Sequence, residues 1–303
     1  MDLYLPIAGV SVNALVIIGL GGLVGFLSGM FGVGGGFLTT PLLIFYGIPP
    51  VVAVASSATQ ITGASVSGLM AYIRRDAVDF RMGWVLVAGG VVGSLLGIVL
   101  FRLLQAIGQI DTAIGLAYVI LLGGIGLLML NESVATLRAT RAGKPPKRIK
   151  RHHRLVAALP LRWRFYRSGL YISPIAPFAL GAVVGALTVL LGVGGGFIMI
   201  PAMIYLLGMS ATAVVGTSLL QILFVTAATT LVHSTTTRAV DIVLAALLLV
   251  GGVVGAQFGA RFALKLKPEM LRFLLALIVL AVAARMALGL GWRPDEIYSV
   301  TAA

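Results

Sequence analysis

The sequence contains no cysteine and few charged residues. Without cysteine a chain has no disulfides, thiolate metal ligands, iron–sulfur clusters or cysteine nucleophiles, so several classes of enzyme and redox protein are excluded. Charged residues make up only 10% of the 303 residues, against about 25% in an ordinary soluble domain. So little charge cannot coat a water-facing surface of this size, and a soluble globular fold is therefore not expected.

Acidic residues are the scarcer charged class, because 9 Asp and Glu stand against 22 Lys and Arg, for a formal net charge of +13. A basic surplus can indicate nucleic-acid binding, but eleven of the 22 basic residues fall between Arg138 and Arg167. A basic block beside apolar segments is typical of a cytoplasmic loop that faces anionic lipid headgroups. We therefore expect a lipid bilayer, and not nucleic acid, as the partner of this chain.

Apolar residues, by contrast, make up 59% of the chain, and the mean hydropathy is +1.09. A transmembrane helix needs about 20 mainly apolar residues, so we predict an all-α polytopic membrane protein with about ten hydrophobic segments. Two segments, Phe37–Tyr46 and Phe197–Leu207, are about half a span long, and each directly follows a GVGGG string. The eight full spans are predicted near residues 12–30, 51–73, 83–103, 111–130, 174–191, 211–232, 240–262 and 270–290.

The two halves of the sequence resemble each other. Residues 21–41, GGLVGFLSGMFGVGGGFLTTP, align without gaps on residues 181–201, GAVVGALTVLLGVGGGFIMIP, with 11 of 21 positions identical. After single-residue shifts in the alignment, Asp79 matches Asp241 in the second half. This internal similarity predicts a duplicated membrane unit.

The duplication divides the chain into a first membrane repeat over 1–131, a basic loop over 132–172 and a second repeat over 173–303. Each half makes an odd number of passes or half-passes, so the second enters the bilayer upside down, as in the inverted repeats of many secondary transporters.

With the N-terminus outside, 18 of the 22 basic residues lie on the cytoplasmic side, as the positive-inside rule requires. We predict a multi-pass protein of the bacterial plasma membrane with a cytoplasmic central loop and both termini outside.

The duplicated GVGGG strings should interrupt a helix, because each glycine in a helix interior costs about 1 kcal/mol relative to alanine. Irregular backbone at membrane depth is tolerated only where it is buried in protein or lines a cavity. The amides that begin the short helices would then present positive helix ends to an anion. The candidate substrate-binding glycines are Gly34, Gly35, Gly36, Gly194, Gly195 and Gly196.

The alternative role of glycine is close helix packing, since small residues let transmembrane backbones approach one another. We favour packing for the glycines that lie four residues apart outside the GVGGG strings. These are Gly89, Gly93 and Gly97 in the first half and Gly251, Gly255 and Gly259 in the second.

Polar side chains follow each glycine string on the next span: Ser57 and Gln60 in the first half, Ser218 and Gln221 in the second. Residues three apart share a helix face, and hydroxyls and amides can hydrogen-bond an oxyanion without holding it by a full charge. The alternative is hydrogen bonding between helices, which is common in membranes. We leave both roles open for the serines and favour substrate binding for the glutamines.

Ionisable side chains are nearly absent from the middle of the spans. We interpret His233 as a solvated residue near a span end, with proton relay as the alternative, and Asp79 and Asp241 as caps of the helices that follow them. The sequence has no GxSxG or HExxH motif and no mid-span pair of aspartates. We therefore expect no catalytic residues, no metal and no cofactor.

The two strings GVGGGFLTTPLLIFYGIPPVVAVASSATQ and GVGGGFIMIPAMIYLLGMSATAVVGTSLLQ resemble the TauE/SafE family of sulfite exporters, and the resemblance covers nearly the whole chain. The family is associated with the movement of sulfite, sulfoacetate, thiosulfate and other sulfur-containing or organic anions across the plasma membrane. The resemblance implies that the candidate glycines, serines and glutamines surround the substrate. The basic segment 138–167 is variable in such proteins and says nothing about the substrate.

The expected function is a secondary transporter for a small sulfur-containing or organic anion, working by alternating access at the two glycine breaks. Export is the expected direction, because an inside-negative potential expels anions by about 2.3 kcal/mol per charge and 100 mV. A passive anion channel is the main alternative. An intramembrane enzyme and a membrane anchor for a cytoplasmic protein are weaker ones, and a homo-oligomer is left open.

Overall fold

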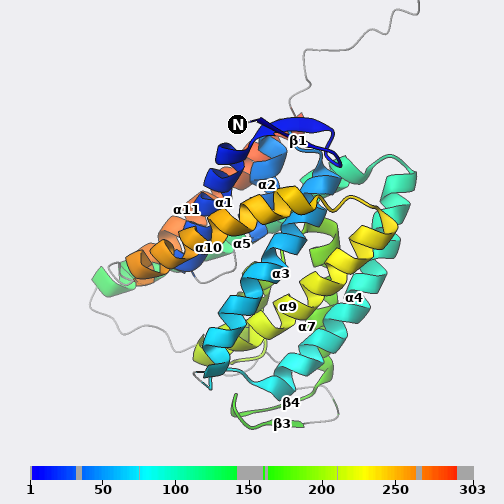
Figure 1. Ribbon diagram of the computed structural model, residues 1–303. Coiled ribbons are helices and arrows are strands. Elements are labelled where there is room, and N and C mark those ends of the chain that lie inside the picture. The colour runs from blue at the N-terminus through cyan, green and yellow to red at the C-terminus, as the bar shows by residue number, and fades with distance from the viewer. Residues whose placement is uncertain are drawn as a thin grey trace, which may run out of the picture.

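The computed structural model describes residues 2–31, 36–74, 76–141, 160, 163–209, 211–263 and 268–291. The described residues form ten helices and two β-hairpins, in the same order in both halves of the chain (Figure 1). The first half contains β1 (Asp2–Leu5), β2 (Val10–Asn13), α1 (Ala14–Phe31), α2 (Gly36–Phe45), α3 (Pro50–Arg74), α4 (Phe80–Ala106) and α5 (Ile110–Arg141). The second contains β3 (Trp163–Phe165), β4 (Leu170–Ile172), α7 (Ile175–Leu191), α8 (Gly196–Tyr205), α9 (Ala211–Thr236), α10 (Ile242–Ala263) and α11 (Pro268–Gly291).

All the predicted hydrophobic segments are helical, and their ends lie within a few residues of the prediction except that α5 continues to Arg141. Five helices are long and apolar enough to cross a membrane: α4, α5, α9, α10 and α11. The 25 residues of α3 are sufficient in length, but its serines, threonines and glutamine lower its hydropathy. Helices α1 and α7 have 18 and 17 residues, or about 26 Å at 1.5 Å per residue. The prediction of eight full spans is thus confirmed only in part.

The two β-hairpins were not predicted, and they are a small exception to the all-α expectation. In each hairpin the strands are antiparallel, with Leu5 opposite Val10 in the first and Phe165 opposite Leu170 in the second. The hairpins lie at opposite ends of the helix bundle, β1–β2 beside the start of α3 and β3–β4 near its end (Figure 1). Each hairpin therefore covers one end of the membrane bundle.

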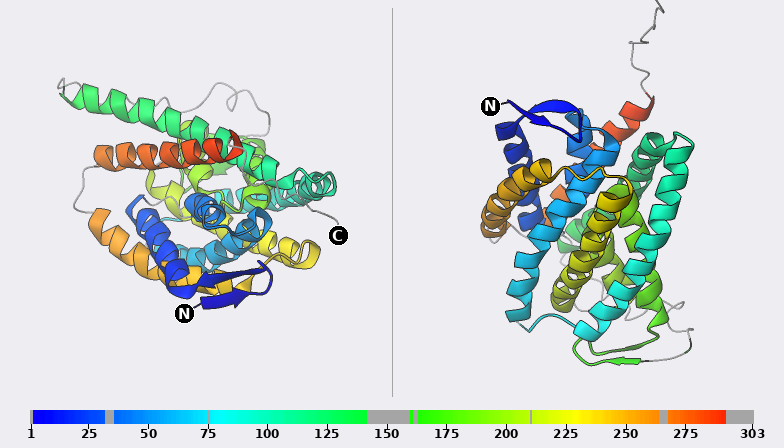
Figure 2. Two further views of the ribbon diagram at one scale, coloured as in Figure 1. Left: turned by 90° about the horizontal axis from the view of Figure 1, so that it is seen from above. Right: turned by 45° about the vertical axis from the view of Figure 1, so that its right-hand side comes forward.

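Helices of one half pack mainly on helices of the other. Helix α1 lies along α10, α4 lies along α7, α5 lies beside α11, and α3 crosses α9 in the centre (Figures 1 and 2). The Thr62 hydroxyl donates to Thr226 Oγ1 at 2.8 Å, and the Thr59 hydroxyl donates to Thr230 Oγ1 at 3.3 Å. Because the residue number falls along α3 as it rises along α9 in these pairs, the two helices run antiparallel.

The glycines of 89–97 and 251–259, which lie outside the GVGGG strings, serve helix packing as predicted. A Cβ at Gly93 would lie 1.9 Å from the Ala182 carbonyl oxygen on α7, and one at Gly255 would lie 2.0 Å from the Gly22 oxygen on α1. No side chain fits at such distances, so the α1–α10 and α4–α7 crossings require glycine.

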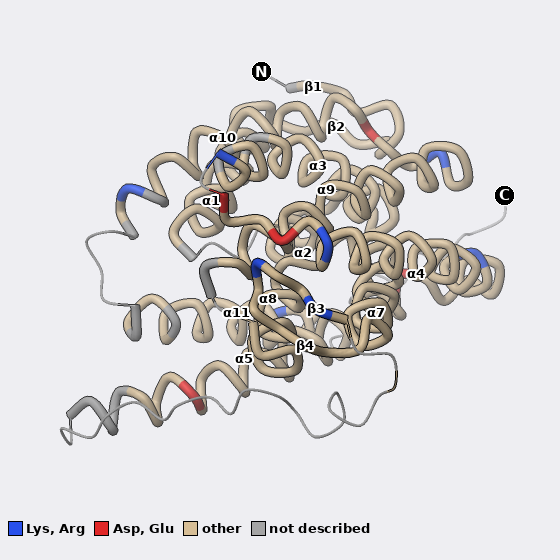
Figure 3. Tube along the Cα trace, turned by 90° about the horizontal axis from the view of Figure 1, so that it is seen from below, with Lys and Arg blue, Asp and Glu red and all other residues tan. Residues whose placement is uncertain are grey.

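The outer surface is mainly apolar in the part of the chain that the structure describes. On α4, for example, Leu96 and Val99 are 65% and 67% exposed, as suits side chains that face lipid. Seen from below, most of the Cα trace carries no charge (Figure 3). The predicted basic loop 132–172 begins inside α5 and ends in hairpin β3–β4, and most of its basic residues lie outside the described residues.

Candidate functional site

The second glycine string forms a sharp break between α7 and α8. Gly192, Gly194 and Gly195 have φ values of 68°, 70° and 78°, in the left-handed region that glycine adopts without strain. The break is buried, and the backbone of Gly195 caps α8 without help from a side chain. The predicted interruption of the helix is therefore confirmed in the second half.

In the first half, Gly34 and Gly35 lie outside the described residues, and α2 begins at Gly36. A Cβ at Gly36 would lie 2.5 Å from the Val193 carbonyl oxygen and 2.1 Å from Ile61 Cδ1. A Cβ at Gly194 would lie 2.8 Å from Ile61 Cγ2. The start of α2 thus contacts the break of the second half directly, with Ile61 of α3 packed against both.

The phenylalanines that follow the two glycine strings meet face to face. The ring centroids of Phe37 and Phe197 are 4.5 Å apart, and their planes are inclined by 14°. Both side chains are 1% exposed and belong to one apolar cluster with Tyr118 and Leu191. Within this cluster the Tyr118 hydroxyl donates to the Leu191 carbonyl oxygen at 2.5 Å. The two short helices are therefore joined at their second residues by an aromatic stack. This stack was not predicted, although Phe follows GVGGG in both copies.

The two glutamines are buried beside the glycine crossings. A Cβ at Gly252 of α10 would lie 3.0 Å from Gln60 Nε2, and one at Gly90 of α4 would lie 3.4 Å from Gln221 Nε2. Gln221 also lies near the break, since a Cβ at Gly195 would be 3.8 Å from its Oε1. The structure thus brings Gln221 to the second break and gives Gln60 the equivalent place against α10.

These amides are not satisfied within the described protein. Gln60 Oε1 and both side-chain polar atoms of Gln221 are buried without a hydrogen-bond partner among the described residues, as is the Ser57 hydroxyl. A buried polar group without a partner costs about 1–3 kcal/mol. Such groups suit a place where a polar solute is bound part of the time.

The second serine differs from the first. The Ser218 hydroxyl donates to the Val215 carbonyl oxygen in its own helix at 2.9 Å. Its neighbour Thr217 instead accepts from the Asp79 backbone N–H at 3.0 Å, and Ser56 accepts from that of Asp241 at 3.1 Å. Of the two serines, Ser57 is thus the one whose hydroxyl has no partner in the part of the chain that the structure describes.

The two aspartates cap helices, as predicted. Asp79 Oδ1 accepts from the Met82 N–H at 3.1 Å, and Asp241 Oδ1 accepts from the Leu244 N–H at 3.0 Å. They occupy equivalent places at the starts of α4 and α10. Helix capping by Asp79 and Asp241 is sufficient to explain their presence, and no role in substrate binding is needed.

The interpretation of His233 as a solvated residue is wrong. Its side chain is 0% exposed, with Nε2 3.0 Å from the Val189 carbonyl oxygen and Nδ1 3.2 Å from Thr237 Oγ1. The ring also packs edge-on against Phe101. Distance from a span end was a poor guide here, because α9 crosses close to the end of α7.

Comparison with known proteins gives the site its context. Residues 17–286 match the protein family described as Sulfite exporter TauE/SafE. The chain belongs to the TauE/SafE family of sulfite exporters. This match covers both GVGGG strings, the aromatic stack and all four candidate polar residues.

Two relatives of this TauE/SafE protein match along nearly their whole lengths. "Probable membrane transporter protein YjnA" of Bacillus subtilis (strain 168) is 30% identical over 277 residues, which are 90% of this chain and 98% of the relative. A "Probable membrane transporter protein" of Xylella fastidiosa (strain Temecula1 / ATCC 700964) is 30% identical over 275 residues, covering 89% and 94% of the two chains. No solved structure matches the chain. Together the family and the apolar helices identify a multi-pass membrane transporter.

Proposed function

We propose that this TauE/SafE protein is a secondary transporter that carries a small sulfur-containing or organic anion, of the sulfite, sulfoacetate or thiosulfate class, across the plasma membrane. Export is the direction that the membrane potential favours for an anion. The substrate binds between the two glycine breaks, beside Gln60 and Gln221, and reaches the two sides of the membrane alternately. The six glycines of the breaks, with Ser57 and Ser218, complete the proposed substrate-binding set.

Inverted repetition supports this mechanism. The elements recur in the same order, and the equivalent helices α3 and α9 cross antiparallel, as the Thr62–Thr226 and Thr59–Thr230 pairs indicate. An antiparallel crossing of equivalent helices is what two oppositely oriented repeats produce. We extend this to the sidedness of the protein and place hairpin β1–β2 with both termini outside, and hairpin β3–β4 with the central loop in the cytoplasm.

The observation that carries the proposal is the contact of the start of α2, at Gly36, with the break at Val193, together with buried amides that have no partner among the described residues. Among the described residues four buried polar atoms have no hydrogen-bond partner, three on the glutamines and one on Ser57. Of these, Gln221 lies beside the non-helical backbone at Gly195. Neutral donors and positive helix ends bind an oxyanion reversibly, because no full charge holds it. An enzyme would need a nucleophile and a base, which these residues do not supply.

The test is anion flux in proteoliposomes, with labelled sulfite, sulfoacetate and thiosulfate offered separately. We expect saturable flux of at least one anion by the wild type and a loss of roughly tenfold or more in Gln221→Leu, which keeps the volume and removes the amide. Thermal stability of Gln221→Leu should be unchanged or higher, since a buried unsatisfied group is removed. The matched control is Gln105→Ala, an exposed glutamine on α4, which should transport normally.

The same assay separates a carrier from a channel. A carrier shows saturation and faster uptake when unlabelled anion is present on the opposite side, whereas a channel shows neither. Flux without acceleration would favour the passive channel. A wild type that is folded in the bilayer and moves none of the three anions would refute the proposed substrate class.

A further inference from the structure

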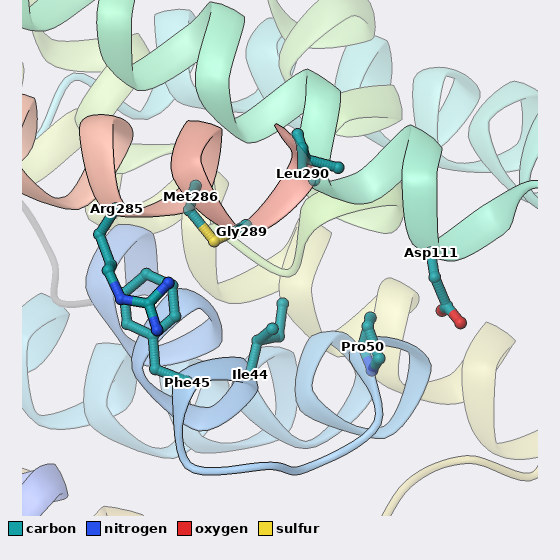
Figure 4. A pocket seen from close by; sticks show the side chains of 9 residues that line it. Ile44, Phe45, Pro50, Asp111, Arg285, Met286, Gly289 and Leu290 are labelled. Atoms are coloured by element: carbon teal, nitrogen blue, oxygen red, sulfur yellow. The ribbon is translucent and has the colours of Figure 1, made fainter. Parts of the chain in front are cut away.

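A pocket opens where the end of α2 meets α5 and α11 (Figure 4). Its volume is about 260 Å³, and it is lined by Ile44, Phe45, Pro50, Asp111, Gly115, Arg285, Met286, Gly289 and Leu290. Neighbouring residues Ile48 and Val52 pack against Leu5 and Val12 of hairpin β1–β2. The pocket therefore lies at the end of the molecule that we place on the outer side of the membrane.

Arg285 is the cation of this pocket. Its guanidinium carbon lies 5.1 Å from the centroid of the Phe45 ring, a contact that orients the group without neutralising it. A Cβ at Gly289 would lie 3.6 Å from Arg285 Nη1, so the glycine leaves room around the guanidinium. Among the described residues the one ion pair is Arg167 with Asp76, and Arg285 faces the pocket without a carboxylate partner.

The other charged residue of the pocket is Asp111, on the far side. Figure 4 shows its carboxylate separated from Arg285 by Ile44 and Pro50. Asp111 lies in the first turn of α5, where a carboxylate is stabilised by the helix dipole. The pocket is thus positive at the Phe45–Arg285 end and negative at the α5 end, so an anion would occupy the first of these.

The floor of the pocket packs on the apolar cluster that holds the phenylalanines of the two short helices. Met286, the neighbour of Arg285, is 6% exposed and belongs to the same apolar cluster as Phe37 and Phe197. Helix α2 runs from the break at Gly36 to Phe45 in the pocket, a distance of about 15 Å for ten residues. One short helix therefore connects the central site with this pocket.

We propose that Arg285, held on the face of Phe45, forms a second binding site for a small oxyanion, at the outer end of the transport path. The site accepts the transported anion after it leaves the breaks, or first from outside when transport is reversed. Guanidinium N–H groups bind the oxygens of such an anion in pairs. This inference rests on the proposed function, because it takes the ligand to be the transported anion.

The absence of cysteine from the chain makes Arg285→Cys a variant with a single thiol. In proteoliposomes loaded with unlabelled anion, uptake of external labelled sulfoacetate should need a roughly tenfold higher concentration for half-saturation, with a maximal rate within about twofold of wild type. An impermeant trimethylammonium maleimide should restore most of the affinity, and a sulfonated maleimide should not. Restoration by charge excludes misfolding as the cause.

Two matched variants sharpen the test. Arg102→Cys, at an exposed arginine outside the pocket, should keep wild-type affinity before and after labelling. Asp111→Asn should lower the half-saturating concentration by about two- to threefold, because it removes a negative charge from the same pocket. An unchanged affinity in Arg285→Cys, or equal rescue by both maleimides, would overturn the proposal.

A measurement without transport separates this proposal from the proposed function. Phenylglyoxal should modify Arg285 in the purified protein, and millimolar sulfoacetate or thiosulfate should slow that reaction. Protection without any flux would retain the anion site and refute the transport function. Flux without protection would retain the transport function and refute the anion site. Loss of bound anionic lipid from Arg285→Cys at unchanged anion affinity would also refute the anion site, because Arg285 would then bind a lipid headgroup.

Discussion

The two hairpins cover equivalent helix starts with different chemistry. At the α4 end, Ser168 donates to Asp79 Oδ2 from its backbone N–H at 3.0 Å and from its hydroxyl at 2.6 Å. The neighbouring Arg167 pairs with Asp76 at 2.7 Å. At the α10 end, Ile7 and Ala8 hold the corresponding places in the turn, and Asp241 Oδ2 has no partner among the described residues.

The fold of the two ends is nevertheless the same. Asp76 and Arg238, both with positive φ, stand at the same place before the capping aspartate. The apolar residues Leu5 and Phe165 anchor the two hairpins. The comparison teaches that apolar packing places each hairpin, while the hydrogen bonds of Ser168 add strength at one end only.

The largest expected effect tests whether the two halves are equivalent where helices cross. Gly25 and Gly185 are equivalent, and a Cβ would meet the Gly252 oxygen at 2.1 Å or the Gly90 oxygen at 2.0 Å. Gly25→Leu and Gly185→Leu should each cost more than about 4 kcal/mol, because backbone must move apart. We expect no monodisperse protein by size-exclusion chromatography for either variant.

The control for these variants is Gly124→Ala on α5, where nothing lies within 4 Å of the added Cβ. This change should be neutral or stabilising by up to about 1 kcal/mol. A folded Gly185→Leu beside an unfolded Gly25→Leu would show that the two crossings are not equivalent.

A smaller effect separates the two capping aspartates. Asp79→Ala removes three accepted hydrogen bonds, including both from Ser168, whereas Asp241→Ala removes one. We expect a loss of about 2–3 kcal/mol for Asp79→Ala and about 1 kcal/mol for Asp241→Ala. Thermal unfolding in detergent measures both, and equal losses would contradict the asymmetry of the hairpins.

The smallest effect transfers the polar contact from one hairpin to the other. Ala8→Ser would offer Asp241 Oδ2 the hydroxyl that Asp79 receives from Ser168, and should stabilise the protein by about 0.5–1 kcal/mol. Ser168→Ala should lose about as much. A destabilising Ala8→Ser would indicate that the buried Ala8, 7% exposed, has no space for a hydroxyl.

The sequence predicted the helices because hydrophobic length and glycine punctuation are local signals. It also predicted that the glycines of 89–97 and 251–259 pack helices and that the aspartates cap them. The hairpins were missed because strands of three or four residues, as in Trp163–Phe165, are too short for a period-two pattern to register. The burial of His233 was missed because it depends on which helix crosses α9, and span boundaries do not contain that information.

The candidate site was predicted in part. The second glycine string correctly predicted the break between α7 and α8, whereas the contact of Gly36 with Val193 was not predicted. The stack of Phe37 on Phe197 depends on tertiary packing, which no spacing rule reveals. Gly34 and Gly35 lie outside the described residues. Substrate binding by Gln60 and Gln221 stays a prediction.

The pairing of α1 with α10 also affects how the protein is made. Ile242, where α10 begins, is synthesised more than 200 residues after Phe31, where α1 ends, a delay of about ten seconds or longer at 5–20 residues per second. During that time the glycine-rich face of α1 has no native partner in the membrane. Helix α7, by contrast, has a native partner from the start, because α4 is synthesised before α7. Both helices of the α4–α7 crossing are therefore available for packing before those of the α1–α10 crossing.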